Sequence, residues 1–208
     1  MRRQIHIIEI AILFFLLVSC ATPSKTQQPT ELKPVTPERY FPMQTGFSWT
    51  YDVQEYPGPN QTPEQSNLIV AVKSTKEDSA LLLSGEKEVT YRFGTEGIAK
   101  LPSGNMLLPN QLQVGTSWTV TTSGVVGEAK IVGIEERIAT PAGIFEHCLV
   151  TEEMYSSEGI KIISVFALDV GLVRVQDYVN VDGQWFLHTQ ALLRITNVKF
   201  NAKQESEK

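Results

Sequence analysis

The chain has 208 residues, of which 42% are hydrophobic and 20% are charged, a composition typical of a single soluble domain. Its formal net charge is −5, and no cluster of basic residues follows Arg3. A protein that binds nucleic acid needs a basic face to displace counterions, so the charge pattern argues against nucleic acid as a partner.

The first twenty residues have the parts of an export signal. Two arginines follow Met1, residues 10–18 form an unbroken apolar run, and Leu17-Val18-Ser19-Cys20 ends that run with small residues before a cysteine. This end resembles the lipobox of bacterial lipoproteins. The resemblance implies that residues 1–19 are a signal peptide, and that Cys20 carries a diacylglycerol and an amide-linked acyl chain such as palmitate.

Two other interpretations of this segment are weaker. A transmembrane helix needs roughly 20 apolar residues, and residues 10–18 are too few to cross a bilayer. An ordinary secretory signal would carry Cys20 at this position only by chance. Residue 21 is alanine and not the aspartate that retains such lipoproteins in the inner membrane. The resemblance therefore implies a cell-envelope protein, anchored in the outer membrane where the cell has one.

A tether and a domain are expected to follow the signal. Residues 20–39 contain four prolines among Thr, Gln, Lys and Glu, with little that is apolar to bury. Such a segment spans about 25 Å as a flexible coil and roughly 60 Å as polyproline II, so it would hold the domain away from the bilayer. The folded domain is predicted over residues 40–200, and residues 201–208 form a polar tail.

The domain is predicted to be all-β. Between residues 40 and 200 no helical periodicity is sustained, and short β-branched and aromatic runs alternate with turn residues. Asp182-Gly183 predicts a two-residue hairpin, because this dipeptide tolerates positive φ at both central positions. The strand over 185–195 is expected to bury one face that carries Trp185, Leu187, Ala191, Leu193 and Ile195.

Two runs are apolar on both faces of the strand that they predict. Leu68-Ile69-Val70-Ala71-Val72 and residues 160–167 have few polar positions at either parity. Strands covered on both sides need a sheet that curls on itself or packs on another. The sequence therefore predicts antiparallel sheet curled into a barrel or folded into a sandwich.

A repeat divides the domain into two related halves. Gly46-Phe47-Ser48-Trp49-Thr50-Tyr51 recurs 69 residues later as Gly115-Thr116-Ser117-Trp118-Thr119-Val120. In each copy a glycine after a proline-bearing loop opens a run in which Trp alternates with small polar residues, which is how a strand begins after a turn. The two strands are expected to occupy equivalent places, with both indoles buried.

A second resemblance covers most of residues 40–180. The segments Phe41-Pro42, Thr140-Pro141-Ala142-Gly143-Ile144-Phe145 and Val170-Gly171-Leu172-Val173 are similar to a recurrent pattern in secreted bacterial β-rich domains. That resemblance implies the fold. It implies no activity.

The residues that could carry chemistry are few. After the signal peptide the chain has two histidines, His147 and His188, and one cysteine besides Cys20, which is Cys148. The two histidines lack the spacing of a metal site. Adjacent strand residues point to opposite faces, so His147 and Cys148 are not expected to form a nucleophile and base pair, and Cys148 is expected to be buried. A glycoside-cleaving pair of carboxylates brought together from different strands remains an alternative.

We therefore expect a lipid-anchored envelope protein with a non-catalytic role in binding or assembly. Its partners would be the membrane and another envelope protein or the cell wall; Cys20 is the one assigned site, with no cofactor or metal. One alternative is an envelope hydrolase acting on glycan or ester bonds, and another is a carrier of lipid or another hydrophobic ligand. The large aromatic content predicts an interior filled by side chains, with no co-purifying lipid.

Overall fold

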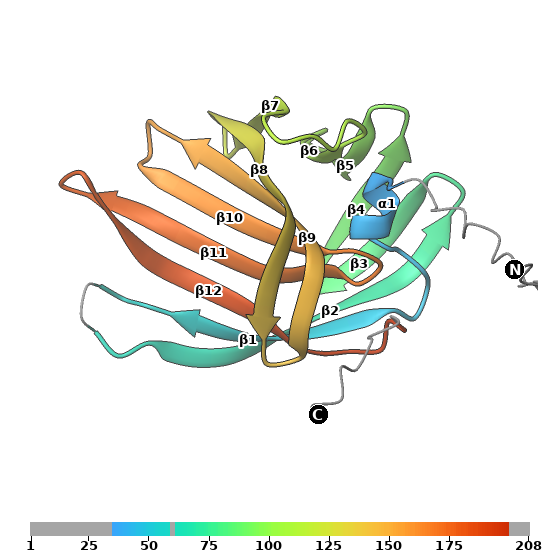
Figure 1. Ribbon diagram of the computed structural model, residues 1–208, viewed down its shortest axis with the longest axis horizontal. Coiled ribbons are helices and arrows are strands. Elements are labelled where there is room, and N and C mark those ends of the chain that lie inside the picture. Colours follow the sequence, from blue (N-terminus) through green and yellow to red (C-terminus); the bar gives the residue numbers. More distant parts are fainter. Residues whose placement is uncertain (1–34, 59–60, 200–208) are drawn as a thin grey trace, which may run out of the picture. The chain divides into compact units, whose positions relative to one another are not determined.

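The computed structural model describes residues 35–58 and 61–199, which form twelve strands and one short helix (Figure 1). The signal peptide, Cys20 and the tail 201–208 lie outside the described residues. The first half of the sheet consists of β1 (Ser48–Glu55), β2 (Glu64–Lys76), β3 (Ser79–Ser84), β4 (Lys87–Gly94), β5 (Gly97–Leu101) and β6 (Met106–Pro109). The second half consists of β7 (Ser117–Thr122), β8 (Val125–Thr140), β9 (Gly143–Tyr155), β10 (Ile160–Ala167), β11 (Gly171–Val181) and β12 (Gln184–Thr196).

All strands belong to one antiparallel sheet in the order β6-β5-β4-β3-β2-β1-β12-β11-β10-β9-β8-β7. Each half is a meander of six strands, and the pairing of β1 with β12 joins the two halves. The sheet curls into a nearly closed barrel (Figure 1). The all-β prediction is confirmed, and the sheet is a barrel and not a sandwich. Among the described residues, no helix has the length and apolar character needed to cross a membrane.

The two copies of the repeat form the same turn. Gly46 and Gly115 have φ of 91° and 92°, a left-handed conformation that favours glycine. The amide of Gly46 donates to the carbonyl of Val72 at 3.0 Å, and the amide of Gly115 donates to that of Ile131 at 2.8 Å. Each turn therefore fixes the register of a hairpin, β1 with β2 and β7 with β8. The turns of the repeat are equivalent as predicted, but the prediction that both indoles are buried is wrong for Trp118, which is half-buried because β7 lies at the edge of the sheet.

The barrel closes through side chains where β6 meets β7. These strands are the two edges of the sheet, and no backbone ladder joins them. The Trp118 indole donates to the carbonyl of Met106 at 2.9 Å. The Thr121 amide donates to Oδ1 of Asn105 at 3.1 Å, and Nδ2 of Asn105 donates to the Thr121 carbonyl. The Asn105 amide thus replaces one peptide group of the missing ladder.

A short helix and the residue after it contribute to the core. Helix α1 (Pro37–Tyr40) lies against β5 and β11, and Tyr40 and Phe41 are buried. The Phe41 ring meets the Tyr91 ring edge-on, with centroids 4.9 Å apart. Nε of Arg39 donates to Oδ1 of Asp169 at 2.8 Å, which ties the helix to the loop before β11. Residues 37–39, assigned to the tether from the sequence, are part of this helix.

Two β-bulges break the alternation in β12. Its pairing with β11 skips His188, and its pairing with β1 skips Arg194. Each bulge turns the residues beyond it to the other face of the sheet. Leu193, between the bulges, is buried, but Trp185 and Ile195 are 37% and 61% exposed. The prediction that Trp185 and Ile195 belong to the core is therefore wrong.

The outer face of β2 also differs from the prediction. Val72 is buried, and Leu68 and Val70 are half-buried on the same face, whereas Ile69 between them is 58% exposed. A barrel buries only the inner face of each strand unless another layer covers it. The prediction that Leu68–Val72 is covered on both sides is therefore wrong for Ile69.

Candidate ligand-binding pocket

The barrel interior contains an apolar pocket of about 340 Å³. Its walls come from β1 to β5 on one side and from β11 and β12 on the other. This volume lies at the lower end of the range of small-molecule sites. The prediction of an interior filled by side chains is wrong for this part of the barrel, because the large aromatic residues line the space without filling it.

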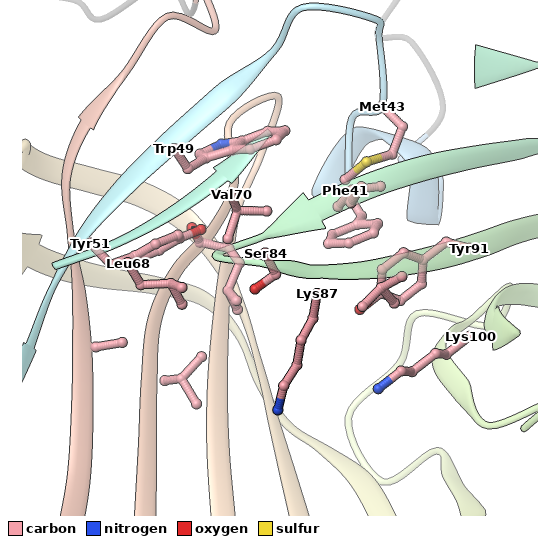
Figure 2. Close-up of a pocket in the computed structure, with 15 residues that line it drawn as sticks. Phe41, Met43, Trp49, Tyr51, Leu68, Val70, Ser84, Lys87, Tyr91 and Lys100 are labelled. Carbon is pink, nitrogen blue, oxygen red and sulfur yellow. The ribbon is translucent and has the colours of Figure 1, made fainter. Parts of the chain in front are cut away.

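Trp49 and Phe41 form one end of the pocket together with Met43 (Figure 2). Trp49 is 3% exposed, and its indole donates to the carbonyl of Val170 at 2.8 Å. Gly171 lies against this indole, since a Cβ added there would come within 3.4 Å of Nε1. With its one polar atom bonded to the backbone, Trp49 offers the pocket only apolar surface.

Tyr51 continues this wall along β1. Its hydroxyl donates to the carbonyl of Leu172 at 2.9 Å, and burial raises the pKa of this hydroxyl above its ordinary value, with a further contribution from Tyr91. The hydroxyl is therefore neutral and already paired at physiological pH. Leu68 and Val70 stand opposite Tyr51 and Trp49 in the pairing of β1 with β2, so the adjoining wall is aliphatic.

Two lysines line the same pocket. Lys87 stands opposite Ser84 in the pairing of β3 with β4, and Lys100 stands opposite Tyr91 in the pairing of β4 with β5. Figure 2 shows the Lys87 side chain reaching away from the end formed by Trp49 and Phe41. Both residues are exposed to solvent, so their ammonium groups stay hydrated while their stems cover apolar surface. Within the described part of the chain, neither lysine forms an ion pair.

Two carboxylates of the second half, Glu153 and Asp177, have raised pKa values. Glu153 of β9 pairs with buried Ala129 of β8, and Ile162 of β10 separates it from Asp177 of β11. Burial raises the pKa of Glu153, while a hydrogen bond from the Tyr155 hydroxyl at 2.9 Å and the charge of Lys100 oppose this shift. Burial likewise raises the pKa of Asp177, against the influence of His188. Neither carboxylate lines the pocket.

The residues that the sequence singled out for chemistry lie apart from the pocket. Cys148 is buried as predicted, its thiol lies 3.6 Å from the carbonyl of Phe145, and burial raises the pKa of the thiol to about 11. His147, with φ of 54°, sits at a bulge that interrupts the predicted alternation. Nδ1 of His188 lies 3.2 Å from the carbonyl of Tyr56. A protonated, buried thiol is a poor nucleophile.

Sequence reasoning missed the two pocket lysines, although a signal for Lys87 was present. Lys87 shares its parity with Val89, Tyr91 and Phe93, so a strand over these residues places the lysine on the apolar face. Across the described residues, no group of three or more His, Cys, Asp or Glu side chains is arranged to hold a metal ion.

No family model matches this chain, and no curated protein matches it. Two solved structures are similar in backbone. A protein of Bacteroides fragilis, named as exported and with a YMCC-like fold, has a TM-score of 0.45 and 16% identity, over 74% of this chain and 97% of that one. A protein of Parabacteroides distasonis, named as a lipoprotein, has a TM-score of 0.40 and 14% identity, over 79% of this chain and all of that one. Both are too distant to bear on function.

Proposed function

We propose that this protein is a lipid-anchored envelope protein whose barrel binds an apolar ligand in the pocket between its two halves. The pocket itself carries the proposal. Its walls are aliphatic and aromatic, and the indole of Trp49 and the hydroxyl of Tyr51 are bonded to backbone carbonyls. Moving apolar surface from water into such a site contributes about 25 cal/mol per Å².

The pocket lining favours binding over hydrolysis. A hydrolase would need two carboxylates, or a serine with a histidine, beside its substrate. The pocket is lined by Ser84 but by no histidine, aspartate or glutamate. A second hollow beside Tyr40 of α1, of about 400 Å³, also lacks these three residue types. We therefore keep the non-catalytic role, and among binding roles we favour the carrier of a hydrophobic ligand.

The anchor is proposed from the lipobox that ends at Cys20. Two or more acyl chains on this cysteine exceed what stable membrane attachment requires. Mass spectrometry of the mature amino terminus should find an acylated cysteine at position 20, and Cys20→Ser should leave the protein outside the detergent phase. An unmodified terminus, or one at another residue, would overturn the anchor without touching the pocket.

The pocket is tested by binding of N-phenyl-1-naphthylamine, a neutral probe that fluoresces in apolar surroundings. Ala191 of β12 lines the pocket, so Ala191→Phe should fill it and weaken probe binding at least tenfold. Ile195→Phe on the outer face of the same strand is the matched control and should bind as the unchanged protein does. Equal binding by both variants, or no binding by the unchanged protein, would contradict the proposal.

A further inference from the structure

We infer that the ligand is a single-chain amphiphile with an acidic head group, its chain against Trp49 and Tyr51 and its head beside Lys87 and Lys100. This inference rests on the proposed function and adds the chemistry of the ligand. A volume of about 340 Å³ is small for a ligand pocket, which favours one chain over two.

The placement of the lysines supports an acidic head. Lys87, Val89 and Tyr91 of β4 all line the pocket, and Lys87 is the first residue of this strand. Lys100 reaches the pocket from the neighbouring strand, opposite Tyr91. Both positive charges thus belong to one pocket. An acidic head group in this pocket would form charge-assisted hydrogen bonds with them.

Two lysines on the outer face of the barrel, Lys73 and Lys161, differ from this pair. Nζ of Lys73 lies 2.6 Å from a carboxylate oxygen of Glu88, and Lys161 lies 4.9 Å from the ring centroids of Tyr178 and Trp185. Each of those ammonium groups thus has a partner within the protein. In the described residues, Lys87 and Lys100 have none within ion-pair distance.

The groups around the lysines leave the positive charge available. The pocket lining contains no acid, and Ser84 opposite Lys87 adds a neutral hydroxyl that can donate to an anion. The charged group that acts on Lys100 across the barrel is Glu153, which accepts a hydrogen bond from Tyr155 and has a pKa raised by burial. Among the described residues, Glu153 does not line the pocket and forms no ion pair with Lys100.

The test measures displacement of N-phenyl-1-naphthylamine from the mature protein by three compounds with the same chain: laurate, lauryl phosphate and monolaurin. Both acids should displace the probe more tightly than neutral monolaurin. The double variant Lys87→Gln/Lys100→Gln should lose about tenfold in affinity for the acids, the size of one charge-assisted contact, with little change for monolaurin. Lys73→Gln is the matched control, and circular dichroism checks that each variant is folded.

The outcomes separate the inference from the proposed function. If the probe does not bind, the pocket proposal fails and the inference fails with it. If the probe binds but acids and monolaurin compete equally, the pocket stands and the acidic head is wrong. The inference would also be overturned if Lys73→Gln removed the preference for acids as fully as the double variant does. The preference would then depend on the net charge of the protein and not on the two pocket lysines. The stronger of the two acids identifies the head as carboxylate or phosphate.

Discussion

The strands β1 and β7 begin with the same turn and the same tryptophan, yet they end in different surroundings. Trp49 is 3% exposed on a strand that pairs with both β2 and β12, whereas Trp118 is half-buried on a strand that pairs with β8 alone. In both copies the indole donates to a backbone carbonyl, at 2.8 and 2.9 Å. The repeated sequence sets the turn, and the place of the strand in the sheet sets the burial.

The two halves also contribute unlike charges to the barrel. The first half supplies Lys87 and Lys100 to the pocket, whereas Glu153 and Asp177 of the second half, whose pKa values burial raises, lie outside the pocket lining. The two halves therefore keep the turns that start them but differ in the charged residues that they carry. The following changes are meant to break or sharpen this comparison.

The largest difference is expected between the two tryptophans. Trp49→Ala should lower the free energy of unfolding by about 3 to 5 kcal/mol, the usual range for truncating a core tryptophan, and it leaves the Val170 carbonyl without its donor. Trp118→Ala should cost roughly half as much, because part of that side chain already meets water. Urea unfolding of both variants gives the two values. Equal losses would show that the edge strand is as well packed as the central one.

A smaller effect is expected from two asparagines that bridge strands. Asn105 bonds to Thr121 across the gap between β6 and β7, and Asn197 accepts from the Ser48 amide and donates to the Gly46 carbonyl, both at 2.8 Å, where β1 begins. Asn105→Ala should cost about 1 kcal/mol and speed hydrogen exchange along β7, since no ladder replaces the lost bonds.

Asn197→Ala is the control for this change. It should leave exchange along β1 nearly unaltered, because β1 keeps its pairing with β2 and β12. Similar exchange in β7 and β1 after the two changes would mean that the gap is closed by something other than Asn105.

The smallest effect concerns pH. Because burial raises the pKa of Glu153, the folded protein holds this proton more tightly than the unfolded chain does. Its contribution to stability is therefore present below the ordinary glutamate value of 4.5 and is lost as pH rises through the raised value. Glu153→Gln should raise the urea midpoint at pH 7.5 and leave it nearly unchanged at pH 4.

Glu152→Gln is the matched control for the pH measurement. Glu152 is the neighbour on β9 and points to the opposite face of the strand, so its replacement should not change the pH dependence. A gain from Glu153→Gln that is larger at pH 4 than at pH 7.5 would contradict the assigned direction.

Much of the fold follows from local sequence. Asp182 and Gly183 have φ of 52° and 85°, as the predicted hairpin requires, and the glycines of the repeat open equivalent strands. The bulges at His188 and Arg194 have no such local cause, since they depend on how β12 pairs with two neighbours at once. That is why the burial of Trp185 was predicted wrongly.

The site was harder to predict than the fold. Whether the aromatic residues fill the barrel or line a pocket depends on the distance between walls that are remote in sequence, such as Tyr51 and Val175. Lys87 could have been placed on the inner face from its parity. That Lys100 lines the same pocket could not be predicted, because it follows from the pairing of Tyr91 with Lys100.

Binding of a ligand inside the barrel is tested most directly on protein purified from the cells that produce it. Organic extraction followed by mass spectrometry should find one non-covalently bound, single-chain acidic lipid per molecule of the unchanged protein. The same extraction should find little of it in Ala191→Phe, in which the pocket is filled. An unchanged protein that carries no such lipid, or the same amount in both proteins, would contradict the account.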